Sequence, residues 1–493
     1  MSCQGSGRVM RFFIYWLSFF MLQLGVWVEH KFETPSFDQI LYHFQYGVDG
    51  LVDADQSLFL NFLKNVIFAP VVIVFILYFI RHLLARKQYF EAGSKRLQTF
   101  WAGRFVVERG SLILLIACAM MLLTKVSFWA HFQQMQYSNF IDKHYVEPVN
   151  IREPKEKRNL VLVYVESLEA TYSDKEIFGD DLLSSLNEST AGWASFSNFS
   201  QTTGTNWTIA GIVSTQCGVP LRPYAGILQR NEVGEKAGVF MPGITCLGDV
   251  LRKAGYKNVF LGGASGSFAG KQKFLFKHGY QEIYGREEWK ALGESEFNDW
   301  GLYDDRLLQR AKKKLDQLAG EDQPFNLTIL TVDTHQPAGY ISKTCEAQGV
   351  TEFSDIVKCS SRLLAEFIDY IKFKGYDKTT DIVIVGDHLA TGNPLIDSLK
   401  KAPQRKIYNK FYSSRGLYPN RDDMYHFGVY PTILTMLGFK FDGGKLALGV
   451  TGFGQIDPKA YSFYMEEAFD RKLGAPSEIY QKFWSGNVKL AQQ

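Results

Sequence analysis

Four apolar segments of the sequence each end in residues whose types suit a binding or catalytic site. The segments are residues 159–165 (NLVLVYV), 257–261 (KNVFL), 325–332 (FNLTILTV) and 381–385 (DIVIV). Glu166 follows the first segment, a glycine-rich turn follows the second, His335 lies just beyond the third, and Asp387 and His388 lie just beyond the fourth. Carboxylate and imidazole ligands together suit Mn²⁺, Mg²⁺ or Zn²⁺ and not a soft copper or iron–sulfur centre. The sequence therefore predicts a cation site, although each acid could instead cap a helix beside a structural histidine.

A candidate nucleophile lies in residues 203–211 (TGTNWTIAG). A glycine-containing loop leads there into an apolar, helix-like run, so Thr208 is expected at or near a helix N-terminus. Free N–H groups and the helix dipole attract anions such as phosphate at that position. A metal bound to the same hydroxyl would lower its pKa and help to form an alkoxide. Thr203 and Thr205 are nearby competitors, and Thr208 could also serve only as a cap.

The elements that must position these residues follow an alternating pattern. Continuous aliphatic and β-branched runs are typical of strands buried on both faces of a parallel sheet. Amphipathic segments lie between or after them, at residues 247–254, 306–318, 360–373 and 431–437. The alternation predicts an α/β fold with helices on both faces of the sheet. Ligands bind outside the carboxyl ends of the strands in such sheets, so the four segments would deliver their polar residues to one rim.

The first 150 residues have a different character. Three apolar segments predict membrane spans at about residues 10–28, 61–81 and 110–129. Buried core helices are the alternative for runs this short. The first segment could also be a signal peptide, but no small-x-small cleavage site follows Val28.

The charges of the loops predict how these spans are oriented. The first loop, residues 29–58, holds one lysine and six acidic residues. The second loop is basic, with Arg81, Arg86, Lys87, Lys95, Arg96, Arg104 and Arg109 at or near it. Positively charged loops stay in the cytoplasm. The N-terminus is therefore expected inside, and everything after about residue 130 outside.

Composition and cysteine usage narrow the function classes. The 493 residues carry 54 Lys+Arg against 51 Asp+Glu, a balance that argues against a dedicated nucleic-acid binder. Four cysteines lie in the exported part, an even number that an oxidising compartment permits to pair. Three pairings are possible. Proximity along the chain favours Cys217–Cys246 and Cys345–Cys359, and four free buried thiols are the alternative.

The order of the motifs resembles a known family. The motifs are VYVES, TNWTIAG, QCGVPL, CLGDVL, WGLYDD, TVDTHQP, VGDHLA and HFGVYPTIL, spread over about residues 158–455. They resemble the membrane phosphoglycerol transferases that modify periplasmic glucans, in the lipoteichoic acid synthase-like and sulfatase-like branch of the alkaline phosphatase superfamily. The resemblance implies a doubly wound, mostly parallel sheet. It divides the chain into a membrane-anchoring region (1–150), an extracytoplasmic transferase domain (151–455) and a C-terminal tail (456–493).

The resemblance also implies roles for individual residues. Metal ligands are expected at Glu166, Thr208, Asp387 and His388, with Thr208 also the nucleophile. His335 resembles the histidine that contacts the substrate phosphate and can protonate a leaving oxygen. Residues that border the headgroup pocket in relatives correspond to Lys271, His278 and Asp304. His426 is expected to be structural rather than a support of the ligands.

Two features depart from related families. Sulfatases form their nucleophile in a Cys-x-Pro-x-Arg context, but Cys217 is followed by Gly-Val-Pro-Leu-Arg, with Pro and Arg each one place too late. This counts against sulfate ester hydrolysis. Relatives also often have four or five spans, whereas three are predicted here.

The resemblance implies transfer of phosphoglycerol from phosphatidylglycerol to a periplasmic glucan through a covalent threonine intermediate. The expected cofactor is Mn²⁺, with Mg²⁺ or Zn²⁺ as alternatives. The protein would be a multi-pass inner-membrane protein with its catalytic domain on the periplasmic side. Three alternatives stay open: a phosphoethanolamine transferase, a sulfatase- or phosphodiesterase-type hydrolase of soluble esters, and an inactive sensor or glucan-binding protein.

Overall fold

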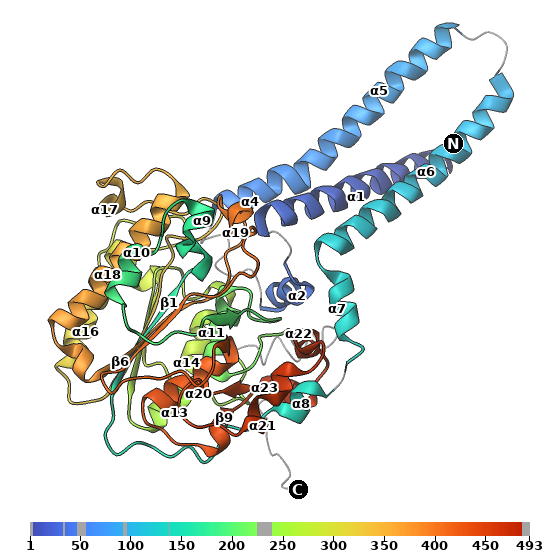
Figure 1. Cartoon of the computed structure of the whole chain (residues 1–493). Coiled ribbons are helices and arrows are strands. Elements are labelled where there is room, and N and C mark those ends of the chain that lie inside the picture. The colour runs from blue at the N-terminus through green and yellow to red at the C-terminus, as the bar shows by residue number, and fades with distance from the viewer. Residues whose placement is uncertain are drawn as a thin grey trace. The chain divides into compact units, whose positions relative to one another are not determined.

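The structure is a computed structural model that describes residues 3–32, 35–46, 56–91, 96–137, 139–223 and 239–485 (Figure 1). The chain divides into two compact units. One comprises residues 1–40 and 55–132, and the other comprises residues 41–54 and 133–493.

The first unit is helical. Its elements are α1 (Cys3–Phe32), α4 (Gln56–Phe62), a π-helix (Leu63–Phe68), α5 (Ala69–Glu91), α6 (Arg96–Lys125) and most of α7 (Phe128–Gln134), with the start of α2 (Phe37–Tyr46). Among the described residues, Met10–Phe32 and Phe59–Ile80 are each long and apolar enough to cross a membrane. Gly110–Lys125 and Phe128–Gln134 pass the same test only as a pair, bent by 64° at Ser127, whose φ is +52°.

The apolar N-terminal helices confirm a membrane region with two or three candidate spans. The three predicted spans fall on these helices, the third of them on the bent pair. The charge argument for orientation still depends on the sequence alone. Lys95 of the second loop and residues 47–55 of the first lie outside the described residues, as do the side chains of the other six basic residues of the second loop.

The second unit is built on a six-stranded sheet with the order β4-β3-β5-β1-β6-β7. The strands are β1 (Asn159–Val165), β3 (Lys257–Gly262), β4 (Glu282–Tyr284), β5 (Phe325–Leu330), β6 (Thr380–Gly386) and β7 (Asn409–Tyr412). All neighbours pair in parallel except β6 and β7. The four predicted strands are therefore confirmed, and they are consecutive in the sheet.

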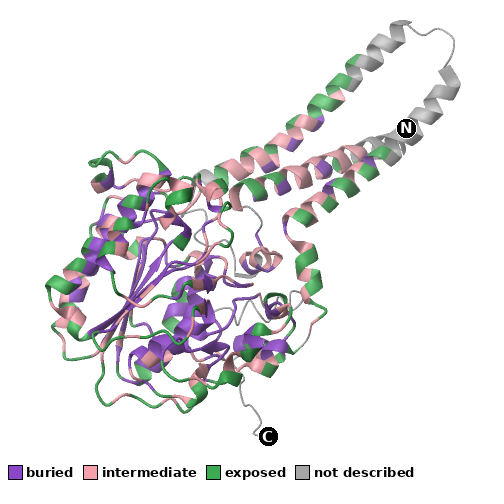
Figure 2. Cartoon of the chain, viewed as in Figure 1, coloured by how far each residue is buried: buried purple, intermediate pink, exposed green. Residues whose placement is uncertain are grey.

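Helices cover both faces of this sheet, as predicted. One layer comprises α11 (Thr208–Cys217), α13 (Leu247–Lys253), α14 (Lys271–Lys277) and α20 (His426–Met436); the other comprises α10 (Ser184–Ser189), α16 (Asp304–Ala319) and α18 (Phe353–Phe373). Side chains of β1 alternate between the two cores: Leu160, Leu162 and Tyr164 pack with the first layer, and the valines between them with the second. Both faces are therefore buried, which explains the continuous apolar runs (Figure 2).

Short elements complete the unit. They are α8 (Phe140–His144), α9 (Lys175–Phe178), β2 (Asn198–Ser200), α15 (Arg286–Ala291), α17 (Lys343–Glu346), α19 (Ile396–Leu399), β8 (Asp423–Tyr425), β9 (Lys445–Leu446), β10 (Gly449–Val450), α21 (Pro458–Tyr461), α22 (Phe469–Leu473) and α23 (Glu478–Ser485). The last three lie in the segment assigned to a C-terminal tail, yet Phe463, Phe469 and Phe483 are buried in the same core as α11. The segment up to Ser485 is thus packed structure.

Two disulfides connect elements of this unit. The bonds are Cys217–Cys246 and Cys345–Cys359, which confirms the pairing favoured by proximity. Cys217 is the last residue of α11, and Cys246 directly precedes α13. The first bond therefore fastens the helix that begins with Thr208 to its neighbour in the same layer.

Candidate active site

Glu166, Asp387 and His388 meet at the carboxyl end of the sheet. Val165 of β1 pairs with Gly386 of β6, so the residues that follow these two strands emerge side by side. All three side chains are buried, and one ligand atom from each lies within 4.8 Å of the others. The structure thus brings together three residues from distant parts of the chain, since 222 positions separate residues 166 and 388.

The ligand atoms of this cluster are oriented for a cation. Asp387 Oδ1 accepts the backbone N–H groups of Ser167 and His388, each at 2.8 Å. Its Oδ2 is buried and has no hydrogen-bond partner among the described residues. His388 Nδ1 donates to the carbonyl oxygen of Leu389 at 2.8 Å, which leaves the Nε2 lone pair 3.6 Å from both Glu166 Oε1 and Asp387 Oδ2. An orphaned buried carboxylate oxygen and a histidine held in the metal-binding tautomer fit a divalent cation.

The electrostatics of the cluster favour added positive charge. Burial, together with the charge of Glu166, raises the pKa of Asp387 to about 7. Burial acts in the same direction on Glu166, but the imidazoles of His335 and His388 hold its pKa below the ordinary value. Burial disfavours charge on His388, yet the two carboxylates raise its pKa. A divalent cation would relieve the repulsion between the buried acids.

Thr208 lies beside this cluster as the first residue of α11. Its Oγ1 donates to Glu166 Oε2 at 3.3 Å. The helix approaches the end of β6 very closely, because a Cβ added to Gly211 would lie 2.1 Å from the carbonyl oxygen of Asp387. Glycine is therefore required there, and this contact fixes the N-terminus of α11 at the carboxylates. The N–H groups of that first turn can bind an anion.

His335 follows β5 on the same rim. Its Nδ1 donates to the carbonyl oxygen of Gln336 at 2.7 Å, which leaves Nε2 available to a substrate. The ring packs against Trp300, with centroids 4.2 Å apart. Its effect on the pKa of Glu166 shows that it lies within electrostatic reach of the cluster.

Lys271 also lies near the cluster. Its side chain is buried at the start of α14, and burial lowers its pKa to about 8, while the charges of Glu166 and Asp387 act in the opposite direction. A buried lysine at this position is a candidate contact for a substrate anion.

Asp304 forms a brace under the rim. Its two carboxylate oxygens accept the N–H groups of Val332 and Asp333 at 2.8 and 3.1 Å, and Asp333 Oδ2 accepts the N–H of Asp304 at 3.0 Å. These bonds fix the chain just before His335. Both carboxylate oxygens accept hydrogen bonds from backbone N–H groups. This geometry favours a structural role for Asp304 over direct contact with substrate.

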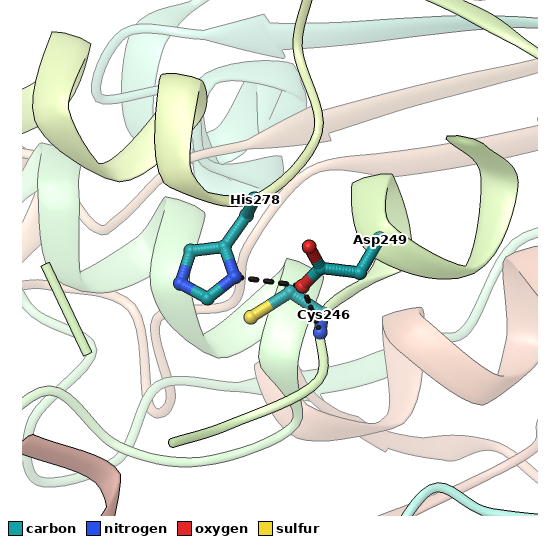
Figure 3. Close-up of side chains that lie close together, drawn as sticks. All are labelled: Cys246, Asp249 and His278. Atoms are coloured by element: carbon teal, nitrogen blue, oxygen red, sulfur yellow. Dashed lines mark hydrogen bonds and ion pairs between the residues drawn. The ribbon is translucent and has the colours of Figure 1, made fainter. Parts of the chain in front are cut away.

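The contacts of His278 lie in another part of the unit. Its Nδ1 donates to Asp249 Oδ2 at 2.7 Å, and the two side chains face each other beside Cys246 (Figure 3). Asp249 Oδ2 also accepts the N–H of Cys246 at 2.9 Å. These three residues resemble a metal cluster by proximity, but the sulfur of Cys246 is bonded to Cys217 and offers no thiolate. The pair supports the start of α13.

His426 supports the backbone of a predicted ligand. It is buried, and its Nε2 donates to the carbonyl oxygen of Asp387 at 3.0 Å. Burial lowers its pKa to about 3, so the ring is neutral. This is a structural contact that also fixes the position of Asp387.

Two further residues of the site carry no separate signal in the sequence analysis. Ser167 adopts φ +53°, and its hydroxyl donates to Glu166 Oε1 at 2.6 Å. Thr334 donates its hydroxyl to the carbonyl oxygen of Glu166, also at 2.6 Å. Both adjoin predicted residues, in the Glu-Ser and Asp-Thr-His motifs, and that adjacency is the one signal that could have identified them.

Comparison with known proteins agrees with this geometry. The family model described as sulfatase matches residues 158–427. Phosphoglycerol transferase I of Citrobacter koseri and that of Escherichia coli are each 40% identical over 280 residues, which cover 55% of this chain and 36% of the relative. The chain thus matches little more than a third of the length of these relatives.

A solved membrane protein has the same fold. The lipooligosaccharide phosphoethanolamine transferase A of Neisseria meningitidis superposes with a TM-score of 0.50 at 14% identity, covering 88% of this chain and 84% of that one. Together with the family model, this match confirms the predicted sulfatase-like fold behind apolar N-terminal helices.

Proposed function

The chain belongs to the sulfatase family, and we propose that it transfers phosphoglycerol from phosphatidylglycerol to a hydroxyl group of a periplasmic glucan. The observation that carries the proposal is the meeting of Glu166, Asp387 and His388 beside the hydroxyl of Thr208. The two relatives named phosphoglycerol transferase I support the choice of the transferred group.

Glu166, Asp387 and His388 would hold a divalent cation, together with Thr208 Oγ1. We propose Mn²⁺, with Mg²⁺ and Zn²⁺ as alternatives. When bound, such a cation lowers the pKa of the threonine hydroxyl and offsets charge on the phosphoryl oxygens.

In the first step Thr208 Oγ1 attacks the phosphorus of the donor lipid. Its hydroxyl proton passes to Glu166 Oε2, to which the hydroxyl donates, as the oxygen attacks. The bond between phosphorus and the diacylglycerol oxygen breaks as the new bond forms. His335 Nε2 gives a proton to the leaving oxygen, because its Nδ1 proton is held by Gln336. Diacylglycerol departs, and phosphoglycerol remains esterified to Thr208.

In the second step a glucan hydroxyl attacks the same phosphorus. His335, now neutral, takes the proton of that hydroxyl, and the bond to Thr208 breaks. Glu166 Oε2 returns the proton to Thr208 Oγ1, and the enzyme returns to its starting state. The N–H groups at the start of α11 stabilise the phosphoryl oxygens in both steps.

A location in the inner membrane, with the second unit on the periplasmic side, suits this chemistry. The apolar helices keep the site close to its lipid donor and so raise the donor's effective concentration. The two disulfides of the second unit are compatible with an oxidising compartment.

The test uses the purified full-length protein in detergent with Mn²⁺, a glucan and one defined phospholipid at a time. Phosphatidylglycerol should yield diacylglycerol, and mass spectrometry should find an adduct of phosphoglycerol mass on Thr208. Thr208→Ala should abolish both products, whereas Thr203→Ala, which changes the competing hydroxyl, should retain the adduct. Release of diacylglycerol from phosphatidylethanolamine instead would identify a phosphoethanolamine transferase. Turnover of soluble esters without a lipid would identify a hydrolase.

A further inference from the structure

A residue between the first two candidate spans is buried in the unit that holds the site. Tyr42 lies in α2, and the segment 41–54 belongs to the second unit. Its side chain is fully buried, and its hydroxyl donates to the carbonyl oxygen of Ala269 at 2.7 Å. Tyr42 and Ala269 are 227 positions apart in the sequence. The loop between two membrane helices thus contributes to the interior of the catalytic unit.

The Tyr42 hydrogen bond fixes an unusual turn. Ala269 has φ +54° and Gly270 has φ +73°, so two consecutive residues adopt the left-handed conformation. Residues other than glycine rarely adopt it without support from their surroundings. Lys271 follows directly and begins α14, and its side chain is buried. The direction in which Lys271 leaves the turn therefore depends on a bond made by Tyr42.

The ring of Tyr42 also contacts the segment that carries Thr208. Its centroid lies 6.1 Å from that of Trp207, the residue immediately before Thr208. One side chain therefore contacts both the turn before Lys271 and the start of α11.

The next residue, His43, begins a row of ring contacts that leads to His335, the residue that follows β5. Its ring stacks on Phe268 with centroids 5.9 Å apart and planes 28° apart. Phe268 contacts Trp300 at 5.1 Å, and Trp300 contacts His335 at 4.2 Å. A continuous row of rings thus links α2 to His335.

We propose that Tyr42 is a positioning residue that directs Lys271 toward the phosphodiester of the lipid donor. This inference depends on the proposed function for its substrate. Tyr42 acts through the carbonyl oxygen of Ala269 and does not touch the donor. The loop between the first two spans is therefore part of the donor site. Without that loop, the second unit would not keep Lys271 in its orientation.

The first test compares the kinetics of full-length variants. Tyr42→Phe keeps the ring but removes the hydrogen bond, so KM for phosphatidylglycerol should rise about three- to tenfold with kcat changed less than about twofold. In a Lys271→Met background the same change should raise KM less than about twofold, because the residue that it positions is gone. Equal effects in the two backgrounds would overturn the proposal.

The matched control is Tyr430→Phe. Tyr430 is a fully buried tyrosine of α20 whose hydroxyl has no hydrogen-bond partner among the described residues. Its substitution removes the same atom without removing a bond, so KM and kcat should both stay within about twofold of wild type.

The second test needs no activity and separates this proposal from the proposed function. Around the turn, the N–H of Gly270 donates to Ser267 and that of Gln272 donates to Gly266. Hydrogen exchange at residues 266–272 should accelerate in Tyr42→Phe, with wild-type rates elsewhere in the second unit. Unchanged rates, or acceleration spread over the whole unit, would contradict a positioning role. If the wild-type protein released no diacylglycerol, the proposed function would be refuted. The hydrogen-exchange measurement would still test whether Tyr42 holds the turn before Lys271.

Discussion

At the scale of single residues, the free lone pairs of the cluster explain why a cation should stabilise this protein. Asp387 Oδ2 has no hydrogen-bond partner among the described residues, and it lies 3.6 Å from His388 Nε2, beside Glu166. Without a cation, these buried groups lower the free energy of unfolding, and a bound metal ion raises it.

Glu166→Gln should therefore lose most metal binding. Mn²⁺ at a hundredfold excess over Kd should stabilise the folded wild type by about 2.7 kcal/mol and so raise its melting temperature. The melting temperature of the variant should barely change. Activity should fall at least a hundredfold. His278→Gln is the matched control, because its contacts are with Asp249, and it should respond to Mn²⁺ like the wild type. An unchanged response in Glu166→Gln would remove this residue from the ligand set.

The brace formed by Asp304 predicts a pH dependence of stability. Burial raises the pKa of Asp304 to about 7, with the neighbouring acids adding to the effect, whereas an aspartate in the unfolded chain titrates near 3.8. Between these values the folded state binds more protons than the unfolded state, so the free energy of unfolding should fall as pH rises from about 4 to 7.

Asp304→Asn removes the titrating group, but it also removes one of the two hydrogen bonds from the backbone, because an amide NH2 cannot accept an N–H. The variant should be less stable than the wild type at pH 5, and the difference should shrink toward pH 7. Thermal unfolding of the detergent-solubilised proteins at several pH values measures this. A difference that is constant with pH would show that Asp304 ionises normally.

At the scale of elements, the close packing of α11 on β6 determines where the nucleophile lies. Gly211→Ala would place a methyl group 2.1 Å from the carbonyl oxygen of Asp387, so the helix must move. We expect a loss of about 1–3 kcal/mol of stability and at least a tenfold fall in kcat, because small displacements at a reacting centre are costly. Gly320→Ala is the control, since its added Cβ would meet only ordinary contacts at 3.5 Å or more. Full activity of Gly211→Ala would mean that Thr208 need not lie where α11 places it.

The elements differ in how far they are predictable from sequence. Strands β1 and β6 are buried on both faces, so their apolar runs fix their extent, and their parallel pairing brings Glu166 to Asp387. The end of β5 was predicted two residues too late, because Val332 is apolar but its N–H bonds to Asp304 rather than to a strand.

Helix starts were harder to predict. The amphipathic segment predicted at residues 431–437 starts at Pro431, but α20 begins at His426 and contains the proline in its interior. The buried first turn places His426 against Asp387, a tertiary contact that no local pattern records. The role of Tyr42 was not predicted for the same reason, because its hydrogen-bond partner, Ala269, lies 227 positions away in the sequence.

At the scale of the whole chain, the position of Tyr42 limits the number of membrane crossings. By length and composition alone, the described helices provide two spans, or three if the bent pair after Gly110 counts as one. Tyr42 is buried in the same unit as the residues from Gln133 onward. Both must then lie on one side of the membrane, and an even number of crossings must separate them. The helix that contains Phe59–Ile80 and the bent pair would supply two, so with α1 we predict three crossings.

This count predicts which sites a membrane-impermeant maleimide reaches in intact cells. Cysteines would be introduced singly at Glu147 and at Gly93, which lies outside the described residues, after Cys3 and Cys118 are replaced by serine. Glu147→Cys should be labelled from outside, because it follows the third crossing, and Gly93→Cys should be labelled only after the membrane is permeabilised. If only α1 and the helix that contains Phe59–Ile80 crossed, residues 93 and 147 would lie on the same side. Equal labelling of both in intact cells would therefore exclude the three-span topology. It would also mean that Tyr42 cannot reach Ala269, since the two residues would then face opposite sides of the bilayer.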